Sequence, residues 1–234
     1  MEANAKAYRN NIREAIFEIL SETEESYAKN GAALDGENDL RDAPEYFLTV
    51  KIAEGLANKF KSLRYDLEYS VKKIVEHYFS DSETTTSQAV LEGAPDWARF
   101  GQDGKGRFDL VLTGAQSKRI PRYIVEVKRG PRFAHDIERM VYLASLQPDK
   151  NRWNYGFVVT LLRRKTLEQA QQAVTSALEG VFNTHEVLRT HPVVQKIKRG
   201  FNRSVQQLGK GKLDGEHLFG FVFIVDLSDP HLAE

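Results

Sequence analysis

The chain contains no cysteine, few methionines and tryptophans, and no net charge. The lack of cysteine excludes disulfides and thiolate metal sites, so any metal must be held by carboxylates, histidines or backbone oxygens. Oxygen ligands favour a hard ion such as Mg²⁺. Because 33 basic residues balance 33 acidic ones, total charge argues neither for nor against a nucleic-acid partner, and the distribution of charge has to decide.

Long hydrophobic runs are also missing. No apolar segment approaches the ~18 residues that span a bilayer, and residues 1–20 lack the apolar region of a signal peptide. We therefore expect a cytoplasmic protein without a membrane partner. The 234 residues, 41% of them hydrophobic, fit one medium-sized domain with an added segment, or two small domains.

The first part of the chain has the pattern of a helix followed by a linker. Apolar residues recur at helical spacing over residues 5–29 and predict an amphipathic helix. A stretch rich in Gly, Asn and Asp then predicts a linker. This helix is expected to pack on the main domain or on a second copy of the chain, and it is our candidate homodimer interface. The predicted division is 1–41, N-terminal helix and linker, and 42–234, the main domain.

The main domain mixes helical and strand patterns. In residues 62–79 the apolar positions first alternate as in a strand and then recur at helical spacing, with the change near Ser70. The other expected elements are helix 42–60, a hairpin of strands 107–114 and 123–130, helix 133–146, strand 153–162, helix 166–182, a short basic helix 191–208 and strand 219–227. This order predicts an α/β fold with a mixed central sheet flanked by helices.

The strand YIVEVKRG carries two opposite charges inside an otherwise apolar run. Period-two alternation puts Glu126 and Lys128 on one face together with Ile124. Asp109 interrupts the preceding apolar strand, 17 positions upstream of Glu126. Two carboxylates on adjacent strands repel each other unless positive charge lies between them. Lys128 can supply one such charge and a divalent ion the other.

This set of residues suits phosphodiester hydrolysis. Asp109 and Glu126 would hold Mg²⁺, which lowers the pKa of a bound water and neutralises charge on the phosphate. Lys128 would position the attacking water and stabilise the transition state electrostatically. The structural alternative is a salt bridge on an edge strand, because a Glu-x-Lys triplet alone is common by chance.

Asp109 on one strand, followed by Glu126-Val127-Lys128 on the next, resembles the PD-(D/E)XK nuclease superfamily. The resemblance covers residues 42–165 and departs from the motif at Phe108, which stands in place of its proline. It implies a restriction-endonuclease-like fold, Mg²⁺ or Mn²⁺ as cofactor, Asp109 and Glu126 as metal ligands and Lys128 as a catalytic residue. It also implies a glutamate contributed by the preceding helix.

Helical spacing favours Glu45 over Glu54 as that glutamate. Glu45 shares an apolar stripe with the residues three, four, seven, eleven and fifteen positions later: Leu48, Thr49, Ile52, Leu56 and Phe60. Glu54 lies on the polar side. We therefore expect Glu45 to be a catalytic residue and a third metal ligand. The structural alternative is that an acid in the first turn only offsets the helix dipole.

Basic side chains gather near the motif and predict contacts with nucleic acid. The candidates are Lys118, Arg119, Arg122, Arg129 and Arg132. The sequence thus predicts a metal-dependent endonuclease acting on DNA, in restriction or anti-phage defence. Two alternatives stay open: a catalytically inactive nuclease-fold module that binds nucleic acid or a protein partner, and a nuclease directed at RNA.

Overall fold

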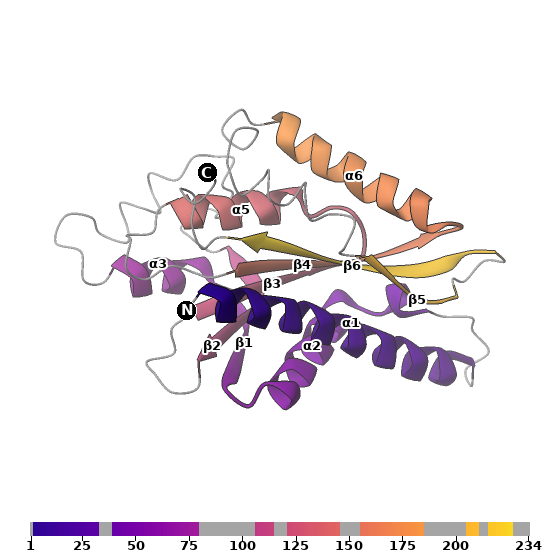
Figure 1. Ribbon diagram of the computed structural model, residues 1–234, viewed down its shortest axis with the longest axis horizontal. Helices are drawn as coiled ribbons and strands as arrows, with labels where there is room; N and C mark the ends of the chain where they lie inside the picture. The colour runs from indigo at the N-terminus through magenta and orange to yellow at the C-terminus, as the bar shows by residue number, and fades with distance from the viewer. Residues whose placement is uncertain are drawn as a thin grey trace.

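A mixed six-stranded sheet lies at the centre of the fold (Figure 1). The computed structural model describes residues 2–32, 39–79, 106–114, 121–145, 155–184, 205–210 and 215–226. The strands are β1 (Leu63–Ser70), β2 (Arg107–Gly114), β3 (Pro121–Lys128), β4 (Tyr155–Arg164), β5 (Val205–Lys210) and β6 (His217–Asp226). They lie in the order β1-β2-β3-β4-β6-β5. Only β3 and β4 pair in parallel, and the other neighbours are antiparallel.

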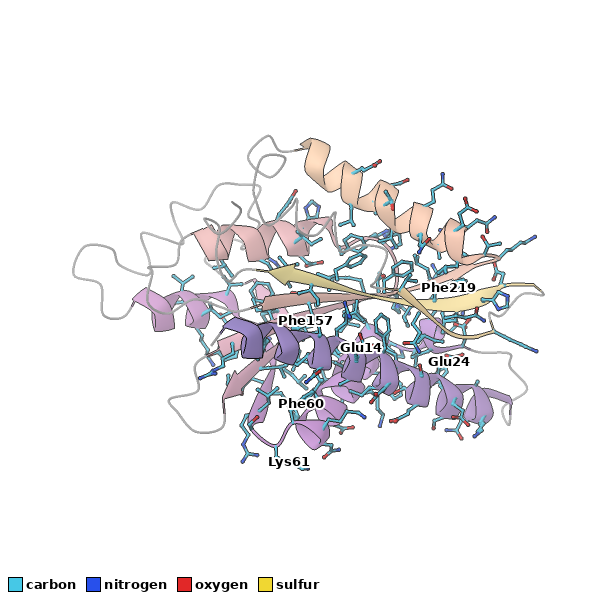
Figure 2. All side chains as sticks on the ribbon, viewed as in Figure 1. Glu14, Glu24, Phe60, Lys61, Phe157 and Phe219 are labelled. Atoms are coloured by element: carbon cyan, nitrogen blue, oxygen red, sulfur yellow. The ribbon has the colours of Figure 1, made fainter. Side chains whose placement is uncertain are left out.

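Helices cover both faces of the sheet. They are α1 (Glu2–Ala32), the 3₁₀ turn η1 (Leu40–Asp42), α2 (Glu45–Lys59), α3 (Val71–Phe79), α5 (Ala134–Ser145) and α6 (Leu167–Thr184). Figure 1 shows α5 and α6 above the sheet and α1 and α2 below it. Because strand side chains alternate between faces, the sheet contributes to two separate cores. Phe157 belongs to the core between the sheet and helices α1 and α2. Phe219 belongs to the core between the sheet and helices α5 and α6 (Figure 2).

Most of the predicted elements are confirmed. The chain does change from strand β1 to helix α3 at Ser70, and β2 and β3 pair antiparallel as a hairpin would. The α/β class, with a mixed sheet between helices, is also confirmed. The second helix begins at Glu45 rather than near Asp42, because a separate 3₁₀ turn comes first.

The prediction of a basic helix over residues 191–208 is wrong at its end. Residues 205–208 belong to strand β5, and residues 191–204 lie outside the described residues. Val205 packs on the core that contains Phe219, and Leu208 on the core that contains Phe157. Strand β5 pairs with β6 and forms one edge of the sheet. Pairing with the next strand of the sheet therefore overrides local helical propensity.

Helix α1 packs on its own chain. Its apolar side is buried with α2, η1 and the sheet, through residues such as Ile12, Ile16 and Leu20. Of the two packing modes expected from the sequence, this is the one on the main domain. The apolar stripe that suggested a dimer interface is thus used internally, and the homodimer stays a prediction. None of the described helices combines the length and apolar character needed to cross a membrane.

Candidate active site

Strands β2 and β3 separate next to Asp109. Their regular pairing runs only as far as Leu110 opposite Val125. Beyond that pair, the Asp109 carboxylate takes the place of a backbone partner and accepts the Val127 N–H at 2.8 Å. Across from this point, Glu68 of β1 has φ 51, an irregularity where Leu67 and Tyr69 pair with β2 but Glu68 does not. The local break lets a carboxylate enter an otherwise apolar pair of strands.

The Lys128 ammonium group lies at the centre of a cluster of carboxylates. The distances from its Nζ are 3.1 Å to Glu126, 3.4 Å to Asp109, 3.4 Å to Glu45 and 3.8 Å to Asp136. The Asp109 and Glu126 carboxylates therefore both lie within 3.4 Å of a single atom. The four residues predicted from the sequence as catalytic meet at this one nitrogen atom.

Glu45 reaches the cluster from the opposite layer because α2 begins beside the end of β3. Its second oxygen accepts the Arg129 N–H at 3.4 Å. The segment before α2 is fastened on both sides, since Arg41 donates to the Arg129 carbonyl at 3.1 Å and Arg163 of β4 pairs with Asp42 at 2.6 Å. These contacts fix where the first residue of α2 lies relative to the sheet.

Asp136 and Arg139 of α5 complete the cluster, and the sequence motif does not identify them as site residues. Arg139 Nη2 donates to Glu126 at 3.0 Å and to Asp136 at 2.6 Å. In the sequence, an acid and a base three positions apart on a helix have the pattern of an ordinary surface ion pair. The only signal in the sequence is their position, because they open the first helix after the Glu-x-Lys strand.

Exposure increases from the floor of the cluster to its rim. The Glu126 side chain is 1% exposed, Lys128 19%, Asp109 20% and Glu45 39%. Burial, with Asp136 and Asp109 nearby, raises the pKa of Glu126 well above its usual value, against the effect of Lys128 and Arg139. Burial also raises the pKa of Asp136. In both cases burial is the largest cause, because removal from water disfavours the charged form of a carboxyl group.

The charge of Lys128 is also set by these neighbours. Burial lowers the pKa of its ammonium group, but Glu126, Asp136, Asp109 and Glu45 together outweigh burial and hold the pKa above its usual value. Lys128 therefore keeps its proton at neutral pH. In this form it can stabilise negative charge.

The donor set fits a hard divalent cation. Four carboxylates surround two cations, Lys128 and Arg139, so two negative charges remain when all groups are ionised. Oxygen-only donors suit Mg²⁺ or Mn²⁺. Within the described ranges, no group of three acidic or histidine side chains has the spacing of a ready-made metal site. The ammonium group of Lys128 lies between the acids, so an entering ion would have to displace it.

The predicted nucleic-acid residues separate into two groups. Arg129 and Arg132 are exposed beside the cluster, between β3 and α5. Arg122 is exposed six positions before Lys128 along β3, which puts it roughly 20 Å from the cluster. Lys118 and Arg119 lie outside the described residues.

No protein-family model matches the chain, and neither a curated protein nor a solved structure shows significant similarity to it. The residues of the cluster, and how they are arranged, are therefore the basis on which a function can be proposed.

Proposed function

We propose that this chain is a divalent-metal-dependent nuclease of the PD-(D/E)XK type that hydrolyses phosphodiester bonds of DNA. The observation that carries the proposal is the convergence of Glu45, Asp109 and Glu126 on the Lys128 ammonium, each within 3.4 Å. Side chains from a helix and two strands, as many as 83 positions apart in sequence, meet at one point. A surface salt bridge would not require this.

The order of the elements supports the same proposal. The superfamily that the motif resembles places an acid-bearing helix before the core, an aspartate on one strand and the Glu-x-Lys motif on the next. Here those places are taken by Glu45 on α2, Asp109 on β2 and Glu126 with Lys128 on β3. A restriction-endonuclease-like fold, and a role in restriction or anti-phage defence, are part of the proposal.

Each residue has a separate task in this proposal. Glu126 and Asp109 would hold the ion from below and Glu45 from the rim. A bound Mg²⁺ or Mn²⁺ would polarise the scissile phosphate and lower the pKa of the attacking water. Lys128 would stay protonated, position that water and stabilise the negative charge that grows on the phosphate. Arg129 and Arg132 would hold the DNA backbone next to the cluster.

Plasmid cleavage tests the proposal directly. Purified protein is incubated with supercoiled and linear DNA in Mg²⁺, in Mn²⁺ and in EDTA. Cleavage is expected with either metal and not with EDTA.

Lys128→Met is expected to lower kcat at least about 100-fold, since it removes a cation at the site of developing charge. Lys51→Met is the matched control, because Lys51 pairs with Glu54 on the exposed side of α2. Cleavage that persists in EDTA or in Lys128→Met would overturn the mechanism.

A catalytically inactive module is the second candidate function. It is favoured by one observation: Lys128 and Arg139 already neutralise part of the cluster, and the acids are not spaced for an ion. Gel-shift titrations in EDTA, over a range of salt concentrations, separate the two candidates. DNA binding without cleavage in either metal supports the module. An RNA substrate run in parallel distinguishes a nuclease directed at RNA.

A further inference from the structure

Arg139 fixes one half of the Glu126 carboxylate. Its Nη2 lies 3.0 Å from Glu126 Oε1, while Glu126 Oε2 faces the Lys128 ammonium at 3.1 Å. The terminal torsion of a glutamate is soft and allows a broad range of angles. With one oxygen bound from the side of α5 and the carboxylate almost fully buried, that range is closed, and one defined oxygen points into the cluster.

Three further contacts hold the Arg139 guanidinium in place. Asp136, one turn earlier on α5, accepts from Nη2 at 2.6 Å, and the Arg107 carbonyl on β2 accepts from Nη1 at 3.2 Å. The guanidinium also lies over the Phe108 ring, 4.9 Å from its centroid. Arg107 and Phe108 immediately precede Asp109, so the same guanidinium touches the strand of one acid and the side chain of the other.

This placement has an energetic cost. Arg139 Nε is buried and has no hydrogen-bond partner among the described residues. Leaving a buried donor unpaired is unfavourable. The two Nη groups, and not Nε, make the contacts with Glu126, Asp136 and Arg107.

We propose that Arg139 is a positioning residue, which orients the Glu126 carboxylate toward the cation site while Asp136 holds Arg139 in place. This inference rests on the proposed function, because it assigns a role around the same metal site. Arg139 does not reach the substrate: its side chain is 13% exposed and its Nη groups are committed to Glu126, Asp136 and Arg107. Replacing a residue that supports a metal ligand in this way typically lowers metal affinity or activity about 10–100-fold.

The test measures Mn²⁺ binding apart from cleavage. Free Mn²⁺ is followed by its electron paramagnetic resonance signal during titration of wild-type, Arg139→Met, Arg139→Lys and Asp136→Asn proteins. Arg139→Met is expected to bind Mn²⁺ about 10–100-fold more weakly, and Arg139→Lys and Asp136→Asn to fall between it and the wild type. At saturating Mn²⁺, kcat should drop in the same order while the KM for DNA stays unchanged.

Two controls make the test decisive. Arg13→Met removes another ion-paired arginine, on α1 and outside the cluster, and should bind Mn²⁺ as the wild type does. Thermal unfolding in EDTA shows which variants are folded, and Arg139→Lys and Asp136→Asn provide the test if Arg139→Met does not fold.

Unchanged or tighter Mn²⁺ binding in the folded variants would overturn the inference, because simple removal of a cation should favour an entering ion. A raised KM with unchanged kcat would also overturn it, in favour of a DNA contact. A wild type that neither binds Mn²⁺ nor cleaves removes the proposed function and this inference together, whereas wild-type binding that the variants share removes only the inference.

Discussion

Glu24 of α1 carries a buried carboxyl group that lies outside the candidate active site (Figure 2). It accepts the Leu40 N–H at 2.6 Å, which ties α1 to the segment that leads into α2. Burial raises its pKa from 4.5 to about 7; the Leu40 bond lowers the pKa, and the nearby Asp39 raises it further. A group whose pKa is higher in the folded protein stabilises the fold only while it is protonated.

Glu24 should therefore make stability decline as pH rises. Its contribution is complete below its unfolded-state pKa of 4.5 and is lost as pH passes through about 7. Glu24→Gln keeps a neutral acceptor for Leu40, so its unfolding free energy should fall less than that of the wild type between about pH 5 and about pH 8. Urea unfolding at a series of pH values measures the difference.

The comparison with Glu24→Gln is needed because Glu126 and Asp136 also have raised pKa values and act in the same direction. Glu25→Gln, at an exposed position that pairs with Lys29, is the control and should follow the wild type. If the wild type and Glu24→Gln lose stability in parallel, the carboxyl of Glu24 is not the titrating group.

At the scale of single residues, the sequence revealed the acids that break an apolar pattern and missed those that do not. Asp109 and Glu126 stand out because a charge inside a buried strand needs a reason. Asp136, Arg139 and Glu24 lie on helices, where charged residues are ordinary on the exposed side, and only tertiary packing buries them. Their burial depends on the position of the sheet, which local patterns do not contain.

Elements were predictable where the period of the pattern changes within the chain. The switch at Ser70 was visible because alternation gives way to helical spacing. Strand β5 was not visible, because its stability comes from β6 and not from its own sequence VQQLGK. The same limit applies to pairs of helices: spacing predicts that α1 and α2 form, but not where they touch.

One such contact lies at Gly55, in the C-terminal half of α2. A Cβ at this position would lie 2.5 Å from both Cγ1 and Cδ1 of Ile19 on α1. In an open helix, Gly→Ala stabilises by up to about 1 kcal/mol. At Gly55 the clash should outweigh that gain, and we expect Gly55→Ala to destabilise the protein by about 1–2 kcal/mol.

Thermal and urea unfolding measure this effect against a matched control. In the part of the chain that the structure describes, no atom lies within 4 Å of a Cβ added at Gly180 of α6, so Gly180→Ala should raise stability. A second substitution, Ile19→Ala, should recover part of the loss in Gly55→Ala by making room for the methyl group. If Gly55→Ala is as stabilising as Gly180→Ala, the two helices do not pack this closely.

For the whole molecule, the sequence predicted the α/β class but not the order of the sheet. The hairpin of β2 and β3 follows from their proximity in the chain. The pairing of β4 with β6 does not, because α6 and β5 lie between these two strands in the sequence. The N-terminal helix presents the same difficulty. Its pattern shows an apolar side, and whether that side meets its own chain or another one depends on the final packing.

Helix α1 should be indispensable to the fold, because it closes one of the two cores. Its large buried side chains are Ile12, Ile16, Phe17, Ile19 and Leu20. Each contributes about 1.5–3 kcal/mol when fully buried, so together they are comparable with the ~5–15 kcal/mol net stability of a typical domain. A chain that begins at residue 42 should therefore lack a cooperative unfolding transition and a near-ultraviolet circular dichroism spectrum.

Point variants on the two sides of α1 separate burial from the mere presence of the helix. Ile16→Asp places a charge at a position that is 0% exposed and should reproduce the loss of cooperative unfolding. Glu18→Asp, on the exposed side of the same helix, should unfold as the wild type does. A chain of residues 42–234 that unfolds cooperatively and binds Mn²⁺ like the full chain would instead make residues 1–41 an appendage. The apolar side of α1 would then again be available to a second copy of the chain.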